Sequence, residues 1–170
     1  MARLFIAVWP PEEVAEELRA LPRKDQRGVR FVPAANWHIT LRFLGEANPD
    51  AVIDALAGAE FAPALARVGP GVDVMSDRAL VVPVSGVDQL AVAVTERTRH
   101  LGEPPRKRFV GHLTLARLKP DAAMPRALGA FVTAEFEVHE VALVRSRLDP
   151  DGARYDTIAS WPVPSPATNG

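Results

Sequence analysis

Two short segments of the sequence carry the same pattern of histidine, aliphatic residue, threonine and leucine. The first runs from His38 to Leu41 and the second from His112 to Leu115. A Phe-Val pair precedes each, and one copy lies in each half of a chain that has only four histidines. One His-x-Thr in a strand means little, whereas two copies indicate a shared site.

The spacing inside each pattern sets the direction of its side chains if the segment is a strand. Residues two apart face the same side, so His38 and Thr40 share one face, as do His112 and Thr114. Each pair is separated by about 6.6 Å along its strand. Two such strands side by side would bring two imidazoles and two hydroxyls together.

Two imidazoles beside two hydroxyls suit the chemistry of a phosphodiester. Attack at phosphorus needs one group that takes a proton from the nucleophile and another that gives a proton to the leaving oxygen. Histidine, with an ordinary pKa of about 6.5, can do either, and repulsion between two imidazoliums keeps one neutral. Threonine hydroxyls can donate to the non-bridging oxygens. The alternative, a zinc site, would need a third ligand that neither pattern supplies, so we expect no metal.

The elements that position these patterns alternate between strand and helix signals. Apolar or alternating runs predict strands, and amphipathic runs behind Pro-Glu or Pro-Asp predict helices. The predicted strands are residues 3–9, 29–32, 38–44, 64–68, 72–74, 79–84, 112–117, 135–147 (a strand or a hairpin) and 155–161. The predicted helices are residues 11–21, 49–58, 87–101 and 122–130.

The organisation of the chain predicts one compact α+β domain over residues 1–161. No linker-like or low-complexity segment interrupts it. Residues 162–170 contain three prolines and no apolar periodicity, so they are expected to form a flexible tail.

Composition excludes several classes of protein. The 170 residues are 48% hydrophobic and 24% charged, which excludes wholesale disorder. A formal net charge of −1 argues against a protein that coats nucleic acid by bulk charge. The absence of cysteine excludes disulfides, thiolate nucleophiles and Cys-ligated metals. No run approaches the ~20 apolar residues of a membrane span, so the cytoplasm is the expected location.

The chain resembles the two-histidine (2H) phosphoesterase superfamily, and within it the LigT-like RNA 2′,3′-cyclic phosphodiesterases, also called 2′-5′ RNA ligases. The resemblance extends from residues 3–8 through residues 38–46 and 112–117 to the hairpin at residues 152–155. It implies a bilobal α+β fold, in which two pseudo-symmetric lobes carry antiparallel sheets flanked by helices, with an active-site groove between them. It also implies hydrolysis of RNA 2′,3′-cyclic phosphate ends to 2′-phosphates without metal or cofactor, and 2′-5′ RNA ligation as a second activity.

The same resemblance assigns roles to the motif residues. His38 and His112 become the catalytic pair, and Thr40 and Thr114 bind the phosphate. We take His112 to activate water and His38 to protonate the departing 3′ oxygen, with the roles exchanged in the ligation direction.

Three residues near the motifs carry further expectations. Arg117 ends the second motif, where the family's arginine contacts the substrate, and a bulge or a strand end near Ala116 must turn it onto the phosphate side. By alternation Arg42 shares the face of His38, so we expect it to reach the phosphate or the flanking RNA. Gly111 stands where the family often has proline, which should loosen the start of the second strand.

The aromatic and basic residues nearby have less specific interpretations. By alternation Phe43 and Trp37 face away from the motif histidine and pack in the core. Trp9 is interpreted as a core or edge residue. Tyr155 is interpreted as a buried residue, with a hydrogen bond to the substrate as the alternative. The basic run at residues 106–108 is either a solvated loop or a segment that steers an RNA backbone.

Two other functions fit the same motifs. A 2H enzyme for another small cyclic phosphate or a 2′-5′ oligonucleotide would carry both, and substrate profiling alone separates it. A non-catalytic RNA-end-binding module has no need of two proton-transfer groups. We expect RNA with a 2′,3′-cyclic phosphate or 2′-phosphate end as the partner, no membrane contact and a monomer, and no ATP requirement because no P-loop is present.

Overall fold

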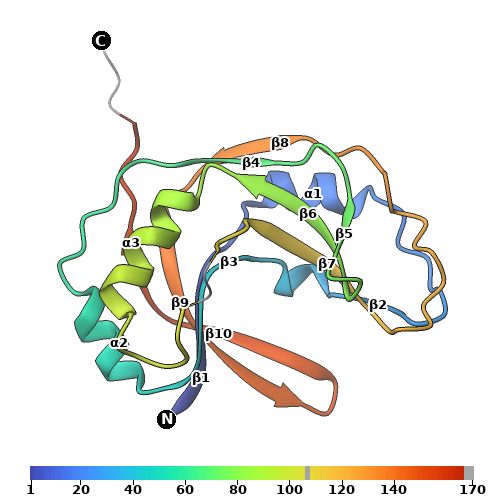
Figure 1. Cartoon of the computed structure of the whole chain (residues 1–170). Helices are drawn as coiled ribbons and strands as arrows, with labels where there is room; N and C mark the ends of the chain where they lie inside the picture. The colour runs from blue at the N-terminus through green and yellow to red at the C-terminus, as the bar shows by residue number, and fades with distance from the viewer. Residues whose placement is uncertain (106–107, 167–170) are drawn as a thin grey trace.

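The computed structural model describes residues 1–105 and 108–166, in which a curled antiparallel sheet is accompanied by three α-helices (Figure 1). The strands are β1 (Ala2–Val8), β2 (Val29–Phe31), β3 (Ile39–Ala47), β4 (Leu65–Val68), β5 (Asp73–Met75), β6 (Ala79–Ser85), β7 (His112–Leu118), β8 (Ala134–Glu137), β9 (Glu140–Asp149) and β10 (Gly152–Pro162). The helices are α1 (Glu12–Arg19), α2 (Pro49–Leu56) and α3 (Asp88–Thr98), with a 3₁₀ turn, η1 (Ala34–Asn36).

The two motif strands, β3 and β7, lie at the centre of the sheet. The strand order is β10-β9-β1-β3-β7-β6-β4-β8, with β2 paired to β7 and β5 paired to β6. The junction between β3 and β7 therefore divides this order into two halves, and each half contributes one histidine motif. This arrangement confirms the α+β fold with two related halves.

The aliphatic residues of the motifs face the core, as the alternation predicted. Ile39 and Leu113 are both fully buried within the main apolar cluster. Helix α3 packs against β3, and α2 packs against α3. The start of α2 is fixed by Asn48, whose side-chain oxygen accepts hydrogen bonds from the backbone N–H groups of Asp50 and Ala51.

The hairpin of β9 and β10 closes the other side of the sheet. Figure 1 shows it projecting beneath β7 and β2, so that the sheet curls around a concave side. Asn36 of η1 fixes this hairpin, because its side-chain amide donates to the carbonyl of Ala153 over 3.0 Å. The hairpin therefore lies against the segment that precedes His38.

Two predicted elements are wrong. Residues 122–130 form isolated turns and no helix, since Pro125 and Gly129 interrupt the run and the N–H of Gly129 bonds to the carbonyl of Val72. Residues 135–147 form two strands in place of one strand or hairpin. The two strands lie in opposite halves of the sheet, because β8 pairs with β4 whereas β9 pairs with β1.

The ordered chain extends past the predicted boundary at residue 161. Pro162 still belongs to β10. Val163 is buried, and its N–H donates to the carbonyl of His139. Residues 164–166 are exposed, and the last four residues of the expected tail lie outside the described residues.

Candidate active site

The two motifs meet across the junction between β3 and β7. Ile39 pairs with Leu113 in antiparallel register. One step along each strand sets His38 opposite Thr114 and Thr40 opposite His112, because antiparallel registers run in opposite directions. We call the side of the sheet on which these four residues project the histidine face.

A β-bulge follows the same position in both motifs. The extra residue is Leu41 in β3 and Leu115 in β7, the fourth residue of each pattern. A bulge shifts the alternation by one residue, so the fifth residue turns inward and the sixth returns to the histidine face. In β7 the fifth residue, Ala116, is fully buried and the sixth, Arg117, is exposed. Of the two predicted alternatives near Ala116, a bulge or a strand end, the structure shows the bulge. The functional role of Arg117 stays a prediction.

The same bulge in β3 overturns the expected placement of Arg42. Its side chain is 4% exposed, and its guanidinium donates to the carbonyls of Phe43 and Leu101. It also lies within hydrogen-bonding distance of the hydroxyl and carbonyl of Thr98 at the end of α3. Simple alternation placed Arg42 on the wrong face, because the sequence alone did not show the bulge at Leu41. We therefore leave Arg42 out of the proposed site.

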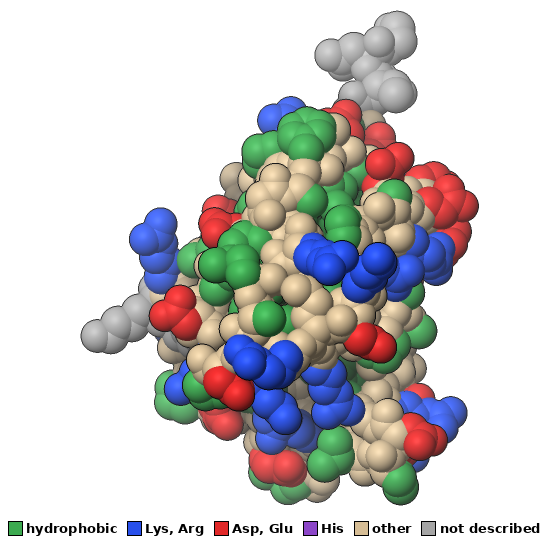
Figure 2. All heavy atoms as spheres, turned by 90° about the vertical axis from the view of Figure 1, so that its right-hand side faces the viewer, with side chains coloured by type: hydrophobic (Ala, Val, Ile, Leu, Met, Phe, Trp, Pro, Cys, Tyr) green, Lys and Arg blue, Asp and Glu red, His purple; other side chains and the backbone are tan. Residues whose placement is uncertain are grey.

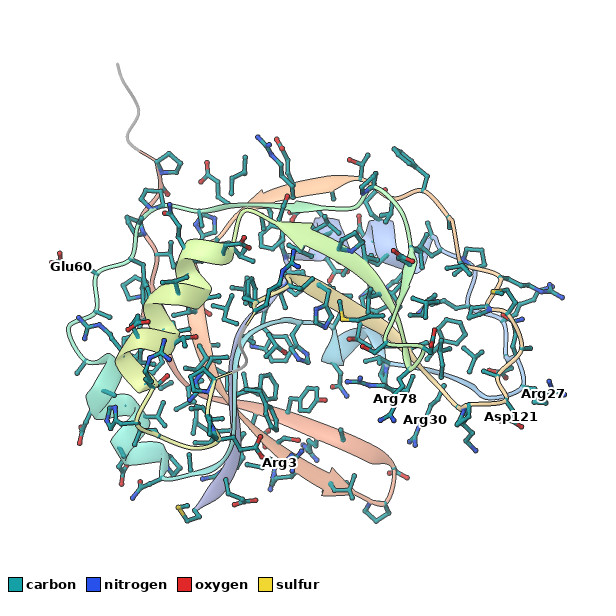
Figure 3. All side chains as sticks on the ribbon, in the orientation of Figure 1. Arg3, Arg27, Arg30, Glu60, Arg78 and Asp121 are labelled. Atoms are coloured by element: carbon teal, nitrogen blue, oxygen red, sulfur yellow. The ribbon has the colours of Figure 1, made fainter. Side chains whose placement is uncertain are left out.

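Phe43 is the counterpart of Arg117 in the first motif, and it too lies opposite to its predicted side. It packs, like Tyr155, against a second apolar cluster that contains Phe5 and lies on the histidine face. Arg3 (labelled in Figure 3) lies over its ring, 5.3 Å from the centroid. Trp37, by contrast, is buried in the main core as predicted.

Both motif imidazoles are held by the same backbone contact. Nδ1 of His38 lies 2.7 Å from the carbonyl oxygen of Asn36, and Nδ1 of His112 lies 2.8 Å from that of Val110. A carbonyl accepts and cannot donate, so in each case Nδ1–H is the donor. The neutral form of each ring therefore carries its free lone pair on Nε2, and only Nε2 is left to exchange a proton with a substrate.

Aromatic rings surround the imidazole of His38. Phe5 of β1 stacks on it with centroids 4.7 Å apart. Tyr155 of β10 and Trp9 meet it edge-on, with centroids at 5.3 and 5.7 Å. Trp9 is itself fixed by a 3.0 Å hydrogen bond from its ring N–H to the hydroxyl of Thr157.

This enclosure changes the acidity of His38. Burial lowers the pKa of the His38 imidazole, and the nearby positive charges of Arg117 and His112 lower this pKa further. The hydrogen bond to the carbonyl of Asn36 acts in the opposite direction. The environment thus favours a neutral imidazole with a free Nε2 lone pair.

Sequence reasoning missed the three aromatic neighbours of His38. The sequence pattern favours a core or edge position for Trp9 and burial for Tyr155, and it assigns no role to Phe5. The alternation of β1 could have placed Phe5 and Ala7 on one face, but no local signal reveals that β1 lies beside β3 or that β10 curls back over His38.

The region before the second motif is tightly packed. Gly111 is buried, and a Cβ atom built on it would lie 2.2 Å from the carbonyl oxygen of Val84. The expectation that glycine loosens the start of this strand is therefore wrong. Of the basic run at residues 106–108, Arg106 and Lys107 lie outside the described residues, and Arg108 is exposed.

The described residues contain neither a cluster of metal ligands nor a membrane-spanning helix. No group of three or more His, Cys, Asp or Glu side chains gathers there in a way that could hold a metal ion. No helix in residues 1–105 or 108–166 is long and apolar enough to cross a membrane.

Known structures with this sheet include phosphoesterases. The fold matches a crystal structure of a Thermus thermophilus protein with a TM-score of 0.78 and 31% identity, covering 97% of this chain and all of that one. It also matches E. coli LigT crystallised with NADP⁺, with a TM-score of 0.78 and 25% identity over 95% of this chain and 97% of that one.

Sequence comparison leads to the same family. Residues 8–69 match the family model described as LigT like Phosphoesterase. Two relatives named RNA 2′,3′-cyclic phosphodiesterase are 33% identical (Thermus thermophilus, 94% of this chain and 89% of the relative) and 30% identical (Archaeoglobus fulgidus, 90% and 96%). The chain belongs to the LigT-like family of 2H phosphoesterases, which confirms the resemblance seen in its motifs.

Proposed function

We propose that this chain hydrolyses RNA 2′,3′-cyclic phosphate ends to 2′-phosphates by acid–base catalysis with His38 and His112. The observation that carries the proposal is the pairing of β3 with β7, which sets two imidazoles with equally fixed Nδ1 atoms beside two threonines. The names of the relatives support this substrate class.

The fixed rings define the proton transfers. One histidine takes a proton from water at Nε2 while the water oxygen bonds to phosphorus. The bond between phosphorus and the 3′ oxygen breaks, and the other histidine donates a proton from Nε2 to that oxygen. The hydroxyls of Thr40 and Thr114 donate to the non-bridging oxygens, where negative charge grows. With the 5′-hydroxyl of a second RNA in place of water, the same steps produce a 2′-5′ linkage.

The environment of His38 favours the role of base for this residue. A lowered pKa keeps His38 neutral at neutral pH, with a lone pair ready at Nε2. The acid must begin protonated on both nitrogens, and this falls to His112. We therefore propose His38 as the base and His112 as the acid, the reverse of the assignment made from the sequence.

The reaction class is tested with purified protein, EDTA and an RNA oligonucleotide ending in a 2′,3′-cyclic phosphate. We expect a 2′-phosphate product and a bell-shaped pH profile. Each of His38→Ala and His112→Ala should lose about 10²–10⁴-fold in kcat, while His139→Gln, which removes an exposed imidazole, should match the wild type. Failure in EDTA would contradict metal independence. Binding of the RNA without turnover would favour the end-binding alternative.

The two histidine roles are separated by a substrate whose 3′ bridging oxygen is replaced by sulfur. A thiolate, with a parent pKa of about 8.5, leaves without protonation more readily than an alkoxide. We expect His112→Ala to regain much of its activity on this substrate and His38→Ala to stay inactive. Rescue of His38→Ala alone would restore the opposite assignment.

Arg117, positioned on the histidine face by its bulge, is proposed to contact the substrate. Three further expectations also stay predictions: that residues 1–161 act as one domain, that the protein is a monomer, and that it is cytoplasmic. The pairing of C-terminal β9 with N-terminal β1 supports the first. Sedimentation of the purified chain tests the second, and fractionation of its host cell tests the third.

A further inference from the structure

A second arginine stands beside Arg117 on the histidine face. Strand β2 pairs with the last part of β7 so that Arg30 lies directly opposite Arg117. Cross-strand partners project to the same side of a sheet, and like charges placed there repel one another. The pair therefore does not stabilise the folded state, which indicates that the two arginines bind an anion.

Within residues 1–105 and 108–166, no carboxylate forms an ion pair with either guanidinium. Both residues are exposed, and neither belongs to an ion pair among the described residues. The charge of Arg117 is close enough to lower the pKa of His38. The pair therefore adjoins the reaction centre and has free hydrogen-bond donors.

Arg30 also reaches the hairpin that borders the concave side. A Cβ atom built on Gly152, at the turn between β9 and β10, would lie 3.4 Å from Nη2 of Arg30. The guanidinium of Arg30 therefore lies in the angle between β2 and the hairpin turn, beside Arg117 on the neighbouring strand.

Other arginines lie near this angle, and the hairpin turn itself carries Asp149, which is paired with Arg154, and Asp151. Figure 3 shows Arg30 and Arg78 drawn between β2 and the hairpin turn, whereas Arg27 points outward at the far edge. The carbonyl of Arg78 accepts a hydrogen bond from Leu118, the residue after Arg117. Figure 2 views the molecule from this side and shows Lys and Arg side chains gathered across the middle and lower part of the face, with scattered Asp and Glu between them.

The distances suit a chain of phosphates. Arg117 lies three positions beyond Thr114, at most about 10 Å along the strand at ~3.3 Å per residue, and Arg30 lies one strand spacing of about 4.8 Å to the side. A nucleotide strand whose terminal phosphate is held by the two threonines can place its next phosphate within reach of both arginines. A planar guanidinium can donate two parallel hydrogen bonds to two oxygens of one phosphate, which makes arginine suited to this position.

We propose that Arg30, together with Arg117, binds the phosphodiester on the 5′ side of the terminal nucleoside. Arg30 thereby makes an RNA strand a better substrate than a mononucleotide cyclic phosphate, which has no such phosphate. This inference rests on the proposed function and adds a specificity-determining residue to it.

The test compares two substrates: a dinucleotide ending in a 2′,3′-cyclic phosphate and a 2′,3′-cyclic mononucleotide. We expect Arg30→Gln to lower the dinucleotide-to-mononucleotide ratio of kcat/KM about 10- to 100-fold, through KM. The slope of log kcat/KM against log salt for the dinucleotide should become shallower by about 0.7. Arg30→Lys, which keeps the charge without the planar fork, should restore part of the ratio.

Arg67→Gln is the matched control, because Arg67 is an exposed arginine on β4, two strands from β7 in the sheet order, and its guanidinium already pairs with Glu135. Its ratio should equal that of the wild type, and thermal melting checks that each variant folds. An unchanged ratio in Arg30→Gln, or an equal loss on both substrates, would overturn the inference while leaving the proposed function intact. If the wild type hydrolyses neither substrate, the proposed function itself is wrong.

Discussion

The ring of Phe5 stacks on the imidazole of His38, with centroids 4.7 Å apart and planes inclined by 28°. Phe5 is 5% exposed and shields one side of the imidazole from water. This contact links the packing of β1 to the acidity of a catalytic candidate, because the exclusion of water is the main cause of the lowered pKa.

Replacement of Phe5 by leucine should loosen this enclosure. We expect Phe5→Leu to raise the pKa of His38 toward its ordinary value and to lower kcat, since the smaller side chain admits water and leaves the ring less fixed. The titration is followed by NMR of the imidazole C–H signals. Phe131→Leu, which changes an exposed phenylalanine, is the control. An unmoved His38 titration in Phe5→Leu would show that Phe5 does not set the environment of this imidazole.

The lowered pKa of His38 also predicts how stability depends on pH. Above the ordinary pKa of about 6.5 the imidazole is neutral in both states, so no proton is exchanged on unfolding. As the pH falls below this value, the unfolded chain takes up a proton that folded His38 resists, and the free energy of unfolding decreases. Stability linked to His38 is therefore present above about pH 6.5 and lost as the pH falls toward the folded-state pKa.

Urea denaturation between about pH 5 and pH 8 measures this effect. We expect His38→Gln to lose less stability than the wild type across the acid part of this range, because the residue that resists protonation is gone. His139→Gln removes an exposed imidazole and should retain the wild-type dependence. The same acid-side slope in His38→Gln and the wild type would contradict the prediction.

The two bulges show where sequence reasoning reached the site and where it stopped. Period-two alternation placed Ile39 and Leu113 in the core and predicted the strands that carry both motifs. It failed after the fourth motif residue, because an extra residue in a strand is revealed by its partner strand and not by its own pattern. For Arg117, strict alternation conflicts with the family's substrate-contacting arginine, and this conflict predicts a bulge or a strand end. No such conflict exists at Arg42, so the bulge in β3 is not predicted.

Contacts between distant segments form the other limit. Tyr155 reaches His38 only because the hairpin of β9 and β10 pairs with β1 and curls back over the sheet. Arg30 meets Arg117 only because β2 adds to β7. Local propensity and spacing contain no information about such neighbours, so these parts of the site appear only once the fold is known.

Arg42 should act on stability and not on the reaction. Its buried guanidinium donates to backbone carbonyls near the end of α3, so Arg42→Met leaves these acceptors without partners. We expect a loss of about 2–4 kcal/mol in the free energy of unfolding. The kcat of the folded fraction should stay within about twofold of the wild type.

Denaturation and turnover are measured on the same Arg42→Met preparation. Arg99→Met serves as the control, because Arg99 is exposed and its ion pair with Glu96 is worth at most about 1 kcal/mol. A large loss of kcat with normal stability would show that Arg42 takes part in the reaction, and it would contradict the structural role inferred from its burial.

Gly111 should not tolerate any side chain. It packs closely against β6, and its backbone directly precedes His112, so a displacement there would also move His112. A Cβ atom there would meet the carbonyl oxygen of Val84 at 2.2 Å, and the N–H of Val84 bonds to the carbonyl of Gly111 itself. Gly111→Ala must therefore push the start of β7 away from β6. We expect a loss of about 1–3 kcal/mol in stability, together with a fall in kcat, since His112 is the next residue.

Gly71→Ala provides the comparison for this variant. A Cβ atom on Gly71 would lie 3.9 Å from its nearest neighbour, the carbonyl oxygen of Ala130, so it fits without displacement. Its stability and kcat should remain close to those of the wild type. If Gly111→Ala lost stability but kept its kcat, the position of His112 would be set by its own hydrogen bond to the carbonyl of Val110 and not by the contact between β6 and β7. If Gly111→Ala kept both, the close approach of Gly111 to Val84 would have no energetic consequence.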